Sequence, residues 1–109
     1  MNIKFYDLPE IDNKNFKDGE KEFFVRTYFD GINKIMSGRL EPGASIGAHT
    51  HYHDSEIIYF LEGEGTVICD GDKTSVVSGE CHYCPKGHEH SLINTGDKDL
   101  IFFACVVTQ

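Results

Sequence analysis

Residues 43–63 read GASIGAHTHYHDSEIIYFLEG, and this stretch decides how the chain is organised. It places His49, His51 and His53 close together and follows them with Glu56. Residues two apart on an extended strand point to the same side, so His49 and His51 can bind one ion together. Imidazole and carboxylate groups are common ligands of borderline divalent metals. The stretch therefore predicts a metal site whose remaining ligands come from elsewhere in the fold.

A second stretch, residues 79–94, reads GECHYCPKGHEHSLIN and supplies another candidate ligand, His90. Together the stretches fit the spacings G-x5-H-x-H-x4-E-x6-G and G-x5-P-x-G-x2-H-x3-N at all ten defined positions. These spacings resemble the two sequence motifs of the cupin superfamily, and the fifteen residues between them resemble the short form of small microbial cupins. The matching positions are Gly43, His49, His51, Glu56, Gly63, Gly79, Pro85, Gly87, His90 and Asn94.

The resemblance implies an all-β fold, a cupin double-stranded β-helix or jelly-roll barrel, with one divalent metal ion in its mouth. It implies that the metal ligands are His49, His51, Glu56 and His90. Small single-domain cupins usually dimerise, so a homodimer is expected. The motifs leave the substrate open, because function depends on the site and not on the barrel.

The rest of the chain also favours short strands, because glycines separate short apolar runs rich in β-forming residues. Residues 21–109 are expected to form one barrel domain. Residues 1–20 are expected to be an arm, mostly loop, that docks on the barrel or on a second subunit. Strands are expected at 22–29, 33–41, 48–51, 56–61, 66–69, 74–77, 79–84, 90–93 and 100–107.

Charge and apolar content limit the possible partners. The formal net charge is −8, whereas a nucleic-acid partner would need a basic face, so no nucleic acid is expected. The N-terminus lacks the apolar region of a signal peptide, and the longest apolar run, residues 100–107, is too short to cross a bilayer. Four cysteines without secretory targeting are expected to be reduced thiols of a cytoplasmic protein.

The ligand types predict what the metal could bind. Three neutral imidazoles and one carboxylate leave a divalent ion with a net charge of about +1, and an octahedral metal with four protein ligands keeps two open positions. Such a site suits a bidentate oxygen donor, for example a hydroxy acid, a 1,2-dicarbonyl, a catechol or an enediol. Iron, manganese, nickel and zinc are all acceptable cofactors, and the ligand types do not rank them.

Three further histidines have several interpretations. His53 is the candidate catalytic residue: it is a fifth ligand, an acid–base group or substrate contact at the mouth, or a solvated loop residue. His88 is expected to be exposed or to lie beside a ligand. His82 alternates with its neighbours on a strand and is expected to be a packing or surface residue.

Four other residues are candidates for the pocket wall. Ile58 and Phe60 share the strand face of Glu56 and are expected to line the pocket. Met36 and Arg39 are added if the strand at 33–41 borders the mouth, where an inward Arg39 would bind an anion.

Two functions follow from these expectations. The open coordination positions favour a metal-dependent enzyme of the dioxygenase, isomerase or decarboxylase class, acting on a small oxygen-rich metabolite. The alternative is a non-catalytic cupin that binds or senses a small molecule. Turnover distinguishes the two, because a ligand that raises the melting temperature but is recovered unchanged supports binding.

Overall fold

The computed structural model describes the whole chain, residues 1–109, and its regular secondary structure is almost entirely β-strand. No helix in it is long and apolar enough to span a bilayer. The strands are β1 (Ile11–Lys14), β2 (Glu22–Phe29), β3 (Lys34–Leu40), β4 (Ser45–Thr50), β5 (Asp54–Glu62), β6 (Glu64–Cys69), β7 (Asp72–Val77), β8 (Cys81–Cys84), β9 (Glu89–Ile93) and β10 (Leu100–Thr108). Two short 3-10 helices, η1 (Phe5–Asp7) and η2 (Phe16–Asp18), flank β1.

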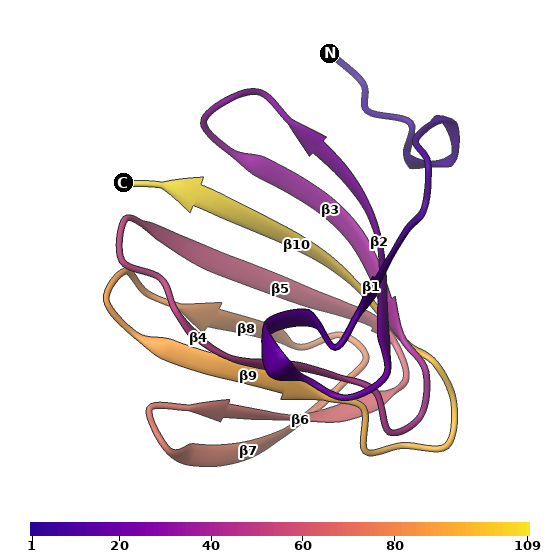
Figure 1. Cartoon of the computed structure of the whole chain (residues 1–109), viewed down its shortest axis with the longest axis vertical. Coiled ribbons are helices and arrows are strands. Elements are labelled where there is room, and N and C mark those ends of the chain that lie inside the picture. The colour runs from indigo at the N-terminus through magenta and orange to yellow at the C-terminus, as the bar shows by residue number, and fades with distance from the viewer.

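The strands form two antiparallel sheets, whose arrangement can be followed in Figure 1. One sheet has the strand order β1-β2-β3-β10-β5-β8, and the other has the order β4-β9-β6-β7. Strands far apart in the sequence are therefore neighbours: β10 lies between β3 and β5, and β9 lies between β4 and β6. The prediction of an all-β double-stranded β-helix is confirmed.

The core lies between the two sheets and follows from the alternation of side chains along each strand. On β5, Ile58 and Phe60 point inward and are fully buried, whereas Ile57, Tyr59 and Leu61 point outward and are exposed. The same alternation on the other strands completes the core, whose least exposed members include Leu40, Phe60, Val67, Leu92, Leu100 and Phe102.

The N-terminal arm contains a strand that the sequence did not suggest. β1 pairs with β2 from Ile11↔Val25 to Lys14↔Glu22, so the prediction of a loop is wrong for these residues. No side chain of β1 is buried, because backbone hydrogen bonds to the sheet edge hold it, and such bonds leave no apolar pattern in the sequence. Further out, the ring of Phe5 packs edge-to-face on Phe103 with centroids 6.2 Å apart.

Cross-strand register arranges the inner face of the six-stranded sheet in rows. Neighbouring strands in such a row are about 4.8 Å apart. Starting near the C-terminal end of β10, the rows are Glu56–Val106–Lys34, Ile58–Ala104–Met36 and Phe60–Phe102–Gly38. The first row places a carboxylate at one end of the sheet, and the rows below it are apolar.

Candidate metal centre

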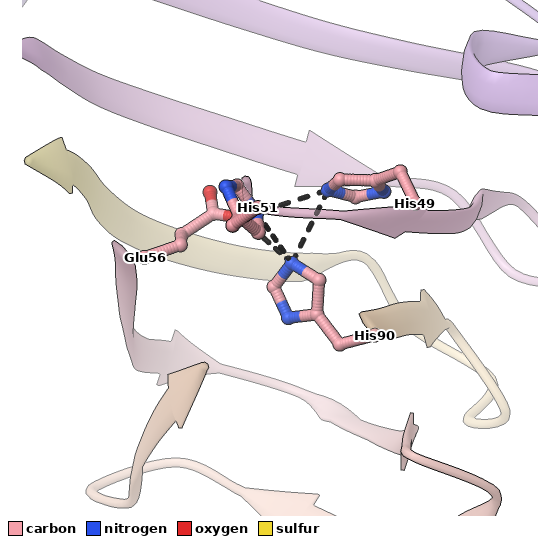
Figure 2. A group of neighbouring side chains, drawn as sticks. All are labelled: His49, His51, Glu56 and His90. Carbon is pink, nitrogen blue, oxygen red and sulfur yellow. Dashed lines mark hydrogen bonds and ion pairs between the residues drawn. The ribbon is translucent and has the colours of Figure 1, made fainter. Parts of the chain in front are cut away.

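Four side chains from both sheets converge on one point, as Figure 2 shows. We call this set, His49, His51, Glu56 and His90, the His–Glu cluster. His49 on β4 is the register partner of His90 on β9, so these two rings leave neighbouring strands. Glu56 projects from β5 in the opposite sheet, and His51 follows directly after β4. The pairing of β4 with β9 is irregular between Ile46 and His49, and such bulges redirect side chains near sites.

The converging atoms are the three imidazole Nε2 atoms and one carboxylate oxygen. His90 Nε2 lies 3.0 Å from His51 Nε2 and 3.2 Å from His49 Nε2. Glu56 Oε1 lies 2.9 Å from His90 Nε2, 3.2 Å from His51 Nε2 and 3.9 Å from His49 Nε2. All four donor atoms lie within 4.8 Å of one another, as in a site that surrounds a single ion.

The rings of His49 and His51 are also oriented by hydrogen bonds through their Nδ1 atoms. His49 Nδ1 donates to the backbone oxygen of Gly47 at 2.8 Å, and His51 Nδ1 donates to Asp54 Oδ1 at 2.5 Å. Since a carbonyl and a carboxylate can only accept, the proton of each neutral ring is on Nδ1. The lone pairs on Nε2 therefore point into the cluster.

This arrangement fits a divalent metal ion. Lone pairs of several imidazoles and a carboxylate oxygen that face one another repel unless a cation lies between them. Metal–nitrogen bonds of about 2.1 Å at right angles would separate neighbouring donors by about 3.0 Å, close to the shorter spacings found in the cluster. Outer partners like those of His49 and His51 are the usual way in which metal-binding imidazoles are oriented.

Two pKa shifts in the cluster each favour the charged form of the group. Burial alone would raise the pKa of Glu56, but when no metal is bound and the rings carry a proton on Nε2, hydrogen bonds from His49, His51 and His90 outweigh burial and hold the pKa well below its ordinary value. Hydrogen bonding to Glu56 and to Asp54 raises the pKa of His51 against the opposing effect of burial. The carboxylate is thus negatively charged and the space beside it favours positive charge, which a bound cation would supply.

His82 is a neighbour of the cluster that the sequence did not reveal. It points inward from β8, and its Nε2 lies 3.0 Å from His90 Nδ1. Burial and the proximity of His90 lower the pKa of His82 to about 4, so its ring is neutral at physiological pH. His82 was expected to be a packing or surface residue. Only the register of β8 against β5, which pairs it with Ile58, brings it near the cluster.

The other two candidate histidines lie in different surroundings. His53 is exposed and lines the cavity in front of the cluster. The side chain of His88 is exposed and hydrogen-bonds with Asp70 on the outside of the barrel. Only the backbone of His88 touches this region, where its oxygen accepts from His51 N at 3.1 Å.

A cavity of about 290 Å³ opens in front of the cluster. Of the four predicted wall residues, Met36 lines it. Ile58 and Phe60 do not, because they lie under it in the packed core. Arg39 does not line it either, since it lies on the outer face of β3, where it pairs with Glu10 at 3.1 Å and stacks on Phe24.

One wall of the cavity comes from the N-terminal arm, which sequence reasoning did not include. Phe16 and Lys17 of η2 line the cavity beside β4. Two hydrogen bonds tie the arm to this strand, Ser45 N to Glu20 O and Glu20 N to Ser45 Oγ. The contact is so close that a Cβ on Gly47 would lie 1.8 Å from the Lys17 oxygen.

Comparison of the sequence with known proteins finds one matching family and several related proteins. The sequence matches the family described as Cupin domain over residues 36–107. An oxalate-binding protein of Thermotoga maritima is 38% identical over 69 residues, which cover 63% of this chain and 57% of that protein. The match therefore spans little more than half of that relative. An uncharacterised protein of Methanocaldococcus jannaschii is 30% identical over 92 residues, covering 82% of this chain and 74% of the relative.

Among solved structures, a Thermotoga maritima protein described as a predicted oxalate decarboxylase superimposes with a TM-score of 0.93. Its sequence is 26% identical, and the superposition covers 100% of both chains.

Proposed function

Because the chain belongs to the cupin family, we propose that its His–Glu cluster holds one divalent metal ion that binds a small, oxygen-rich carboxylate. The observation that carries the proposal is the convergence of Nε2 lone pairs and Glu56 Oε1 on one point, with His49 and His51 fixed through Nδ1. The metal would supply Lewis-acid polarisation of the ligand's oxygen atoms.

The surroundings of the cluster support a carboxylate as the ligand. Lys17 and Lys34 line the cavity, although the chain as a whole has a net charge of −8. Asp54, the acidic lining residue outside the cluster, is hydrogen-bonded to His51. A divalent ion with one carboxylate ligand adds further positive charge at the same place. The name of the oxalate-binding relative agrees with this ligand class.

Turnover of the bound carboxylate is a second candidate function, and His53 favours it. Its imidazole lines the same cavity as the cluster and can give a proton to a bound molecule or take one from it. The sequence-based choice among a dioxygenase, an isomerase and a decarboxylase stays open. The structural neighbour described as a predicted oxalate decarboxylase makes loss of carbon dioxide the first reaction to assay.

The test combines elemental analysis with ligand binding. We expect about one equivalent of metal per chain, and its loss from the His49→Ala/His51→Ala variant. Oxalate should raise the melting temperature of the metal-loaded protein and leave that of the variant unchanged. His88→Ala is the matched control, since its imidazole is exposed outside the barrel, and it should keep both metal and oxalate binding.

Two results would contradict the proposal. One is full metal occupancy in the double variant, and the other is an oxalate effect that is the same with and without metal. Oxalate recovered unchanged after long incubation would leave the binding function, and release of carbon dioxide would establish turnover.

A further inference from the structure

The cavity in front of the His–Glu cluster has one polar end and a long apolar side. The cluster, with neighbouring loop residues, forms the polar end, and the exposed residues Lys17 and Lys34 also line the cavity. We call the apolar side the apolar floor; its residues come from β2, β3, β4 and β10. They are Phe23, Met36, Ile46, Phe102, Ala104 and Val106.

The apolar floor begins directly beside the metal ligands. Val106 is the register partner of Glu56, and Ala104 lies one row further in, next to Met36 on the following strand. Glu56 on β5 and Met36 on β3 are two strand spacings and one row apart, which is roughly 12 Å. A molecule bound at the cluster therefore has an apolar path along the sheet.

Close packing restricts the aromatic rings of the apolar floor, so they do not turn into the cavity. The rings of Phe23 and Phe102 stack with centroids 5.9 Å apart, and Phe16 packs on Phe23 at 5.4 Å. Gly38 lies behind them, and a Cβ there would come within 2.9 Å of both Phe23 and Phe102. The rings are thus held against the sheet by neighbours that leave them little room to move.

The volume exceeds what a ligand without an apolar part would use. The cavity, at about 290 Å³, has the volume of roughly ten water molecules. Oxalate consists of two carboxylates and could occupy only the polar end. Water on the remaining floor would find few polar partners, so replacing it with hydrocarbon is favourable.

We infer that the ligand is a monocarboxylic acid with a second oxygen donor on the adjacent carbon, as in a 2-oxo acid, and with a hydrocarbon tail that lies on the apolar floor. The inference rests on the proposed function, because the carboxylate and its neighbouring oxygen bind at the metal. In addition, the length of the hydrocarbon tail determines which of these acids binds most tightly.

The experiment measures calorimetric dissociation constants on the full-length, manganese(II)-loaded chain. The ligands are pyruvate, 2-oxobutyrate, 2-oxopentanoate and 2-oxohexanoate, with oxalate as a ligand that tests chelation without a tail. Each added methylene should tighten binding about fourfold while it stays on the floor. A dissociation constant that does not change from pyruvate to 2-oxohexanoate would overturn the inference.

Variants of the floor give a second, independent readout. Ala104→Leu fills the floor and should weaken 2-oxohexanoate at least tenfold, while oxalate binding changes less than twofold. Cys105→Leu is the matched control, because Cys105 lies next to Ala104 but points to the outer face, and it should change neither constant. Met36→Ala enlarges the floor and should move the tightest binding to a longer acid, which still decides the matter if Ala104→Leu does not fold.

The outcomes separate the two proposals. If oxalate and pyruvate bind only with metal but tail length and Ala104→Leu have no effect, the inference fails and the proposed function stands. If none of these acids binds the metal-loaded chain better than the His49→Ala/His51→Ala variant, the proposed function itself fails.

Discussion

At the scale of single residues, the three imidazoles of the His–Glu cluster are oriented by three different partners. His49 uses a backbone carbonyl and His51 uses a carboxylate, whereas His90 contacts a second imidazole, His82. If His90 presents its Nε2 lone pair to a metal, its proton must be on Nδ1, and neutral His82 must accept it through Nε2. His82 is then a positioning residue that acts through His90.

The first prediction concerns this contact. His82→Phe removes the acceptor and should lower metal affinity about tenfold or more, the range found for such outer partners. His82→Gln retains an acceptor oxygen and should restore most of the affinity, as measured by competition with a chelating dye. Equal affinities for the Phe variant and the wild-type chain would show that His82 only fills space.

The four residues of the cluster could be grouped from the sequence because they stand at defined positions of the two motifs that resemble those of cupins. His49 and His51 are two apart, and Glu56 follows on the next strand. His82, in contrast, lies only eight residues before His90, but the two strands that carry them are in different sheets. Their contact depends on how the sheets face each other, which no local pattern contains.

At the scale of elements, the segment between β9 and β10 is fixed by the buried side chain of Asn94. Its Nδ2 donates to Leu40 O at 2.7 Å and to Lys98 O at 2.8 Å, while its Oδ1 accepts from Gly96 N at 2.9 Å. Asn94 is the last position of the second motif, so this motif holds the barrel together as well as supplying His90.

The second prediction follows from these bonds. Asn94→Ala leaves buried backbone groups without partners and should lower the free energy of unfolding by about 2–3 kcal/mol, measured by urea titration. Ser78→Ala removes a hydrogen bond at the surface, from Ser78 Oγ to Leu61 O, and should cost less than about 0.5 kcal/mol. Similar losses in the two variants would contradict this role for Asn94.

Most strands were predicted within a few residues, and the elements that were missed have a common cause. β2, β3, β5 and β10 carry the apolar alternation that marks a strand with one face in a core. β1 and η2 carry none: backbone hydrogen bonds to β2 hold β1, and hydrogen bonds between Glu20 and Ser45 hold the segment after η2 on β4. The cavity wall formed by Phe16 and Lys17 therefore could not be predicted from the sequence.

At the scale of the whole molecule, the outer face of the six-stranded sheet is covered unevenly. The arm covers part of it, where Phe5 packs on Phe103 and Arg26 donates to the backbone oxygen of Leu8. The part over β5 and β8 is open and apolar, with exposed side chains on both strands. They are Ile57, Tyr59, Leu61 and Tyr83.

The third prediction is that a second copy of the chain covers this open part. Light scattering should give a native mass near twice 12.3 kDa, and Tyr59→Lys/Leu61→Lys should reduce it to that of one chain. Val77→Lys, at an exposed position on β7 of the other sheet, should leave the mass unchanged. A wild-type chain that runs as a monomer would remove the argument for a homodimer.

The close contact between the arm and β4 has an evolutionary consequence. Barrel strands and the loop after β4 carry the metal ligands, whereas the first twenty residues supply one wall of the ligand cavity, so the two properties are encoded in separate segments. Exchanging this N-terminal segment between related proteins would change one wall of the ligand cavity without rebuilding the metal centre or the apolar floor. Gly47 connects the metal centre with the arm. Its backbone oxygen accepts a hydrogen bond from His49, and its lack of a Cβ leaves space for the backbone oxygen of Lys17. Lineages that diversify through the arm should therefore keep this glycine.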